Sequence, residues 1–372
     1  MEKREFKKLK TKPSLLGFGC MRFPTLEDGE IDKEQVRIMF SEAFKGGVTY
    51  FDTAYPYHGG QSELVVGEIL KDYARDSFTI TTKLPVWKVF KEEDILKIFN
   101  EQLTKLQMDY VDFYLIHAID KVKYDHIKSL GVFEKMVALK KQGKIKHLGF
   151  SFHGVLEDFI YILEDGKKYW DIVQIQLNYM DLDHQQGITG YNLLEKYDIP
   201  VIIMEPVKGG SLSKLPSNIS LPLFLKHPTW SISSWAFRFL FQFKNIVTIL
   251  SGMSNLYQVE DNIKTFNSED RYDTEDYEII AKVRENLEKR IFVPCTGCKY
   301  CMPCPAGVDI KNIFARYNEM YIYDRCTDFD LEVLIEDSYL ESCVKCGVCL
   351  SKCPQSIKIP SKLEEIKKNI NK

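Results

Sequence analysis

Short apolar, β-branched segments alternate with longer amphipathic segments through most of this 372-residue chain. About eight segments typical of strands alternate with about eight typical of helices over roughly the first 270 residues. The strand-like segments lie near residues 15–21, 48–52, 78–83, 110–117, 145–150, 172–177, 201–204 and 246–250. This order predicts an α/β fold of the (β/α)8 TIM-barrel type.

A doubly wound open sheet is the rival α/β arrangement, and it usually carries a glycine-rich turn after its first strand. Here Gly17-Phe18-Gly19 lacks the third glycine of that turn. We therefore favour the barrel, with a first helix bounded by Asp32 and by Gly46-Gly47.

The composition changes near residue 290, before a cysteine-rich stretch that begins at Pro294. Of the ten cysteines, only Cys20 lies before residue 295. Disulfides would be scattered through a secreted chain, whereas a terminal cluster indicates a metal module in a reducing compartment. We predict two domains, residues 1–290 and 291–372, in a cytoplasmic protein.

Charge and hydropathy exclude several classes of partner. The formal net charge of -3 gives no reason to expect nucleic acid or an anionic membrane. Apolar runs such as 199–204 are too short to span a bilayer, and no apolar segment follows the charged start at residues 1–5. We expect small-molecule chemistry, without a membrane or nucleic acid.

Three successive strand segments end in the titratable residues Asp52, Lys83 and His117, and Tyr57 follows Asp52 in the loop before a helix. Active sites of parallel barrels lie at the carboxyl ends of the strands, so we expect these residues to meet. Carbonyl reduction needs a hydride donor and an acid that protonates the oxygen. Tyr57 can be that acid if Lys83, held charged by Asp52, lowers its pKa from about 10. Any one of these residues, taken alone, more often has a structural role. Their shared placement at strand ends favours an active site, in which His117 can donate a hydrogen bond to the carbonyl oxygen.

These four residues resemble the Asp/Tyr/Lys/His tetrad of the aldo-keto reductases. Similar family segments are Leu16–Arg22, Gly149–Ser151, Gln174–Gln176, and Ser251–Asn255 with Asn262. The resemblance covers about residues 5–270 and implies a nicotinamide-dependent reductase of an aldehyde or ketone, with the tetrad as its catalytic residues. Trp87 is placed like a substrate-pocket aromatic, although packing at the rim explains it equally well.

The resemblance also implies which residues hold the cofactor, NADP(H) or NAD(H). They are Gly19, Met21, Ser151, Gln174, Met204, Gly252, Ser254, Gln258 and Asn262. Ser151 and Gln174 match the pair that holds the nicotinamide carboxamide, and Met204 replaces the Tyr that many members stack on the ring. Gly252 and Gln258 stand where many members have Lys and Arg for the 2′-phosphate. We therefore expect weak discrimination between NADPH and NADH.

The cysteines after residue 294 form two runs of four. The first run is Cys295, Cys298, Cys301 and Cys304; the second is Cys343, Cys346, Cys349 and Cys353. The second has the bacterial ferredoxin spacing, with Pro354 after its last cysteine, and the first is one residue shorter. Three thiolates at i, i+3 and i+6 wrap one face of a cubane cluster, and the fourth ligand then comes from the other run. We therefore expect Cys353 to complete the first cluster and Cys304 to complete the second. The stretch resembles a small α-rich, ferredoxin-like domain with two [4Fe–4S] clusters.

Zinc is the alternative metal, but structural zinc sites usually combine two separated cysteine pairs, which these runs fit poorly. Two alternative functions also stay open. One is an electron-transfer enzyme that couples the clusters to the nicotinamide site and uses a redox partner protein. The other is a redox-sensing scaffold without turnover. A flavin ordinarily links single-electron clusters to hydride chemistry, and we find no persuasive flavin motif.

Overall fold

The computed structural model describes the chain except residues 296, 298–299, 325–333, 336–337, 354 and 371–372. The chain divides into two compact units, residues 1–213 with 233–273 and residues 214–232 with 274–372. The domain boundary that we placed near residue 290 stays a prediction.

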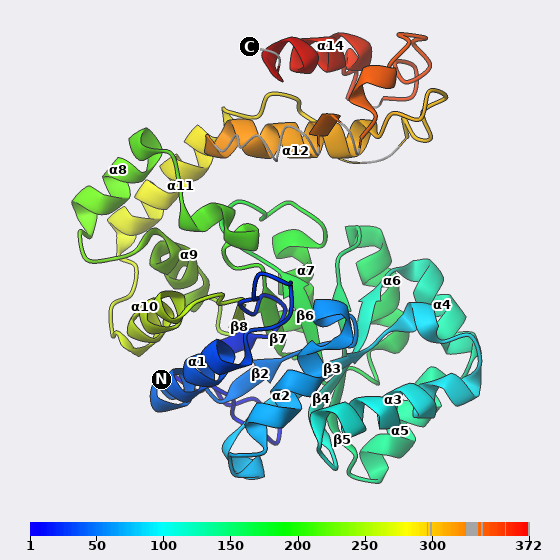
Figure 1. Cartoon of the computed structure of the whole chain (residues 1–372), viewed down its shortest axis with the longest axis vertical. Coiled ribbons are helices and arrows are strands. Elements are labelled where there is room, and N and C mark those ends of the chain that lie inside the picture. Colours follow the sequence, from blue (N-terminus) through cyan, green and yellow to red (C-terminus); the bar gives the residue numbers. More distant parts are fainter. Residues whose placement is uncertain (296, 298–299, 325–333, 336–337, 354, 371–372) are drawn as a thin grey trace. The chain divides into compact units, whose positions relative to one another are not determined.

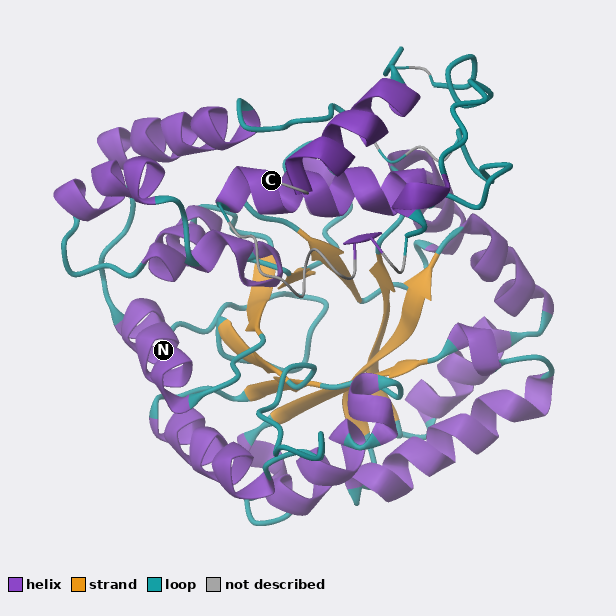
Figure 2. Cartoon of the chain, turned by 45° about the horizontal axis from the view of Figure 1, so that its top comes forward, coloured by secondary structure: helices purple, strands orange, loops and turns teal. Residues whose placement is uncertain are grey.

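Eight parallel strands close into a barrel in the first unit, drawn in orange in Figure 2. They are β1 (Leu16–Gly19), β2 (Tyr50–Asp52), β3 (Thr79–Leu84), β4 (Val111–Ile119), β5 (Ile145–Phe152), β6 (Ile172–Gln176), β7 (Val201–Met204) and β8 (Ile246–Ser251). β1 pairs with both β2 and β8, which closes the sheet. The predicted (β/α)8 barrel is thus confirmed.

Helices surround the strands (Figure 1). They are α1 (Lys33–Lys45), α2 (Ser62–Leu70), α3 (Glu92–Leu106), α4 (Lys121–Ser129), α5 (Val132–Lys141), α6 (Leu156–Gly166), α7 (Gly187–Lys196), α9 (Ile232–Phe241) and α10 (Leu256–Asn267), with short 3-10 helices η1 (Tyr57–Gly60), η2 (Arg75–Ser77), η3 (Val86–Lys88) and η4 (Lys208–Ser213). The Asp32 side chain accepts a hydrogen bond from Gln35 N at 3.0 Å and caps α1, which ends before Gly46 as expected. The mostly polar α4 was not predicted.

Two glycines let β1 approach β8 closely. A Cβ at Gly17 would lie 2.8 Å from the Leu250 side chain, and a Cβ at Gly19 would lie 3.2 Å from the Ser251 carbonyl oxygen. The glycines of Gly17-Phe18-Gly19 therefore serve barrel closure rather than a dinucleotide-binding turn.

The N-terminal segment contributes to the packing inside the barrel. Leu9 packs with inward-facing residues of β2, β4, β6, β7 and β8. Arg4 Nη1 donates hydrogen bonds to the carbonyl oxygens of Phe243 at 2.6 Å and Ile246 at 3.2 Å, just before and at the start of β8. Lys10 N donates to His147 Nε2 at 3.2 Å. This segment is anchored at the amino ends of strands, and the predicted site residues lie at the carboxyl ends.

The second unit contains α8 (Ser217–Lys226), α11 (Thr274–Glu288), α12 (Ile310–Tyr323), η5 (Leu340–Ser342) and α14 (Ile359–Ile370). The helix α8 was not predicted, and it contains Pro222, a residue that normally interrupts a helix. The stretch that we expected to be thin in apolar residues has its own core, against which cysteines of both runs pack. The core consists of Val293, Val308, Ile310, Ile313, Phe314, Tyr317, Leu334, Leu340, Ile357, Ile359, Leu363 and Ile366. Within the described residues of the chain, we find no helix with the length and apolar character needed to cross a membrane.

Candidate active site and cysteine cavities

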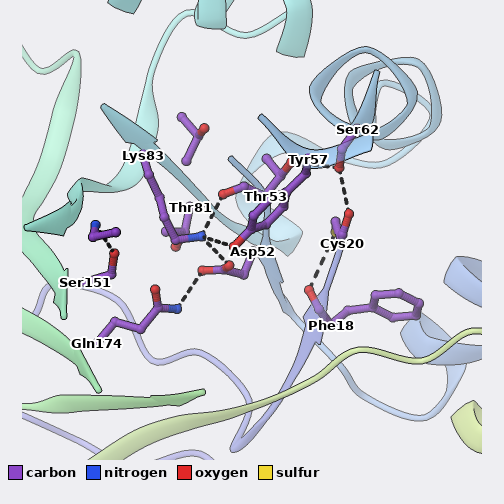
Figure 3. A network of polar contacts seen from close by, with 12 residues as sticks. Phe18, Cys20, Asp52, Thr53, Tyr57, Ser62, Thr81, Lys83, Ser151 and Gln174 are labelled. Atoms are coloured by element: carbon purple, nitrogen blue, oxygen red, sulfur yellow. Dashed lines mark hydrogen bonds and ion pairs between the residues drawn. The ribbon is translucent and has the colours of Figure 1, made fainter. Parts of the chain in front are cut away.

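Three adjacent strands and one loop bring the tetrad together. Asp52 ends β2, Lys83 is the next-to-last residue of β3, His117 lies near the end of β4, and Tyr57 begins η1. The side chains of Asp52, Lys83 and Tyr57 point toward one another in Figure 3. Lys83 is only 1% exposed and Asp52 2%, so their charges interact in a largely dry environment.

The Lys83 ammonium donates to three oxygens. Its Nζ lies 2.6 Å from Asp52 Oδ1, 2.9 Å from the Thr53 carbonyl oxygen and 3.3 Å from the Tyr57 hydroxyl. These contacts match the three donors of an ammonium group. The contact with the Thr53 carbonyl oxygen could not be predicted from sequence, because any residue at that position would supply a backbone carbonyl.

Burial and pairing act on the ion pair in opposite directions. Burial works to lower the pKa of Lys83, but Asp52 and Tyr57 raise it, and the resulting pKa lies above the usual value. Burial raises the pKa of Asp52, while Lys83 and Gln174 oppose this shift. Gln174 Nε2 donates to Asp52 Oδ2 at 3.2 Å. Lys83 therefore keeps its proton beside the Tyr57 hydroxyl.

The protonation of Tyr57 corrects one expectation. Lys83 does favour the phenolate, but burial of the hydroxyl is the larger effect, and the pKa of Tyr57 lies above its usual value of 10.0. We had expected Lys83 to bring this pKa down. Tyr57 instead remains a neutral phenol at physiological pH, with a cation in place to stabilise negative charge when its proton leaves.

His117, near the end of β4, lies close to Tyr57, which follows β2. Their ring centroids lie 6.1 Å apart in an edge-on arrangement, and the Trp87 ring lies 5.2 Å from that of His117. Burial, followed by the charge of Lys83, lowers the pKa of His117 to about 2. His117 is therefore neutral and can act as a hydrogen-bond donor, but not as a cation.

The predicted carboxamide pair lies beside the tetrad. Ser151 on β5 and Gln174 on β6 are register partners, and both are almost fully buried. Ser151 Oγ accepts a hydrogen bond from Ala118 N at 2.9 Å, and Gln174 contacts Asp52 (Figure 3). The two side chains are thus held in fixed positions one strand apart.

The other predicted cofactor residues come from four parts of the barrel. Gly19 ends β1 and Met21 follows it, Met204 ends β7, Gly252 and Ser254 follow β8, and Gln258 and Asn262 lie on α10. Several already have protein partners. Ser254 N donates to Gln258 Oε1 at 2.7 Å, and Asn262 Nδ2 donates to Ser251 Oγ at 2.8 Å. The amide oxygen of Gln258 and the amide nitrogen of Asn262 therefore brace this loop; their roles toward a cofactor stay predictions.

A second ion pair, which sequence reasoning missed, links the loops after β6 and β7. Lys208 Nζ donates to Asp181 Oδ1 at 2.7 Å and to Oδ2 at 2.9 Å, and Gln176 Nε2 donates to Oδ2 at 2.7 Å. Burial raises the pKa of Asp181, but Lys208 more than offsets it and the pKa lies below its usual value. The partners are 27 residues apart, and no sequence pattern joins them.

In the second unit, the cysteines line two small cavities. Cys295, Cys301 and Cys353 line the first cavity. Cys301, Cys304, Cys343, Cys346 and Cys349 line the second. Cys298 lies outside the described residues. The structure therefore brings Cys353 to the first run and Cys304 to the second.

Thiol-lined cavities suit iron–sulfur clusters, which cysteine thiolates hold. The chemistry of these donors thus fits the predicted cluster type.

Comparison with known proteins identifies two family matches in this chain. Residues 15–285 match the model of the aldo/keto reductase family, and residues 294–358 match that of the 4Fe-4S dicluster domain. The first match spans the whole barrel, and the second spans both cysteine runs.

Individual relatives cover mainly the barrel. L-galactose dehydrogenase of Arabidopsis thaliana is 28% identical over 278 residues, 68% of this chain and 84% of that protein. NADH-specific methylglyoxal reductase of Escherichia coli (strain K12) is 22% identical over 285 residues, 64% of this chain and 85% of that protein. The structure of an aldo-keto reductase from Klebsiella pneumoniae in complex with NADPH superposes with a TM-score of 0.63 at 17% identity, covering 76% of this chain and 96% of the other.

Proposed function

This chain belongs to the aldo/keto reductase family and carries a 4Fe-4S dicluster domain, and we propose that it reduces an aldehyde or ketone at the mouth of its barrel with NADPH or NADH. The observation that carries this proposal is the contact of Lys83 with both Asp52, at 2.6 Å, and Tyr57, at 3.3 Å. An acid, a cation and the carboxylate that anchors it make up the proton-transfer equipment that carbonyl reduction requires.

The chain's residues would act as follows. When bound, the nicotinamide would supply the hydride that carbonyl reduction requires. Tyr57 donates its hydroxyl proton to the carbonyl oxygen, and Lys83 stabilises the phenolate that remains. Asp52 keeps Lys83 charged and oriented, and neutral His117 donates a hydrogen bond to the same oxygen. Ser151 and Gln174 orient the carboxamide of the nicotinamide.

The relatives support small carbonyl substrates and do not single out one cofactor. One is named for L-galactose, one for methylglyoxal and NADH, and one solved relative contains NADPH. In this chain Gly252 and Gln258 provide no cation for a 2′-phosphate. We therefore propose that the chain uses both cofactors, with a preference for NADPH below about 1000-fold. A charged contact to the 2′-phosphate would typically contribute about 1.5–3 kcal/mol, and positions 252 and 258 supply no such contact.

The test is a turnover assay on anaerobically purified protein with methylglyoxal, aldoses and aromatic aldehydes, each with NADH and NADPH. Reduction of at least one carbonyl, abolished in the Lys83→Met variant, would support the proposal. Cofactor binding without reduction of any carbonyl would favour the redox-sensing scaffold.

For the second unit we propose two [4Fe–4S] clusters with crossed ligation. Cys295, Cys298, Cys301 and Cys353 hold one cluster; Cys343, Cys346, Cys349 and Cys304 hold the other. The cavities support this set, because each includes a cysteine from the opposite run. About eight irons per chain, and a Cys353→Ser variant that loses the cluster of the first run, are expected from iron analysis and electron paramagnetic resonance. Stoichiometric zinc without iron would contradict the assignment.

Electron transfer is a second candidate function, favoured by the exposure of Cys346 in the second cavity. One hydride carries two electrons, which could reduce two clusters by one electron each with release of one proton. Bleaching of the cluster absorbance when NADH or NADPH is added anaerobically would support this function. Fully oxidised clusters after that addition would contradict it.

A further inference from the structure

Arg22, in the loop after β1, crosses the loops that follow β7 and β8. A Cβ at Gly252, after β8, would lie 3.1 Å from Arg22 Cδ and 3.4 Å from its Cγ. At Gly209, after β7, a Cβ would lie 3.5 Å from Arg22 Nη2. The aliphatic stem of Arg22 thus lies on one loop, and the guanidinium reaches the other.

The positive charge of Arg22 is not neutralised by any described residue. Neighbouring cations in the barrel are paired: Lys83 with Asp52 at 2.6 Å, and Lys208 with Asp181 at 2.7 Å. For Arg22, by contrast, the described parts of the chain provide neither an ion pair nor a hydrogen-bond acceptor. An unpaired, exposed guanidinium among these loops is available to an anionic ligand.

The glycine at position 252 explains how Arg22 reaches this place. At 3.1 Å from Arg22 Cδ, even a Cβ would be tighter than an ordinary contact. A longer side chain would therefore compete with Arg22 for the same space.

We propose that Arg22, in the loop after β1, binds the diphosphate of the nicotinamide cofactor. This inference rests on the proposed function. A guanidinium fork suits phosphate oxygens, because it can donate two parallel hydrogen bonds. The Arg22 guanidinium lies at the loop after β7. On one side of this loop are Ser151 and Gln174, which are proposed to hold the nicotinamide, and on the other side is the loop after β8, which is proposed to hold the adenosine. The diphosphate joins these two parts of the cofactor and is the same in NADH and NADPH, so Arg22 would strengthen binding of both without discriminating between them.

The test measures dissociation constants of NADH and NADPH by calorimetry on the anaerobically purified full chain. Arg22→Gln should weaken both by about 10- to 100-fold, the range for lost hydrogen bonds to a charged group. Arg22→Lys should retain part of the affinity. Arg37→Gln is the matched control, since Arg37 pairs with Asp72 on the outer surface at 2.7 Å and its removal changes the net charge equally. The control should leave both constants unchanged.

Two results would overturn the inference. One is unchanged binding of both nucleotides in Arg22→Gln, and the other is a loss confined to NADPH, which would place Arg22 at the 2′-phosphate. These failures differ from failure of the proposed function, which would be seen in the wild-type chain itself: it would bind neither nucleotide, or bind one without reducing any carbonyl.

Discussion

At the scale of single residues, burial sets the protonation states of Tyr57 and His117 more than the nearest charge does. Lys83 lies 3.3 Å from the Tyr57 hydroxyl, yet burial keeps the pKa of Tyr57 above 10.0. The same effect lowers the pKa of His117 to about 2. Both groups are therefore neutral across the physiological range, and Lys83 with Asp52 carries the charges of the tetrad.

Replacing Tyr57 by Phe removes the proposed acid while keeping the ring. We expect carbonyl turnover to fall by about 10²-fold or more, because general acid catalysis typically contributes that much. The dissociation constant for the cofactor should change little. Turnover equal to wild type would show that another group supplies the proton.

The pH profile of kcat/KM should be flat between about pH 6 and pH 9. Tyr57 acts as the protonated acid, and its raised pKa preserves that form until the pH exceeds 10. His117 acts as the neutral imidazole, and its pKa of about 2 means that no proton is gained near pH 6.5. A break near pH 6.5 that disappears in His117→Gln would contradict this assignment.

At the scale of elements, the N-terminal segment stabilises the barrel from the end opposite the tetrad. Leu9 joins the interior cluster, and Arg4 donates to carbonyl oxygens at the start of β8. Catalytic loops and stabilising contacts are thus placed at opposite ends of the strands, as is usual for this fold.

Leu9→Ala should therefore destabilise the barrel without changing its chemistry. We expect a loss of about 2 kcal/mol in the free energy of unfolding, at the low end for Leu→Ala because Leu9, at 9% exposure, lies at the edge of the buried cluster. Measured well below the melting temperature, kcat/KM should stay within about twofold of wild type. Leu96→Ala, at a site 39% exposed on α3, is the control and should cost less than about 0.5 kcal/mol. A large loss of activity in a folded Leu9→Ala protein would mean that the two ends are coupled.

At the scale of the whole molecule, two units with separate cores should respond differently to loss of iron. The barrel has its own interior cluster, whereas cysteines of both runs pack against the core of the second unit. Metal binding often contributes much of the folding free energy of such small modules.

Removal of iron by a chelator under anaerobic conditions should unfold residues 291–372 and leave the barrel folded. Limited proteolysis should then remove fragments of that segment first, and circular dichroism should retain the barrel's unfolding transition. Equal protection of both parts after complete iron removal would show that the clusters are not needed for folding.

The alternation of strand-like and helix-like segments was enough to identify the barrel, because the period of apolar residues reflects which face each segment buries. The placement of Asp52, Lys83 and His117 at strand ends also followed from sequence, since parallel strands in a barrel direct their carboxyl ends the same way. Likewise, the spacing of the cysteines predicted crossed sets, and the cavities bring Cys353 and Cys304 to the opposite runs.

Only the tertiary structure decided the net pKa shift of Tyr57, the partner of Lys208 and the course of Arg22. Burial depends on every element packed around a group, and the strengths of opposing effects cannot be read from neighbours in sequence. Arg22 comes close to Gly209 and Gly252 only because β1, β7 and β8 end side by side when the barrel closes. The sequence thus determined which elements form and which chemical groups they carry, whereas packing determined the protonation of those groups and which of them meet.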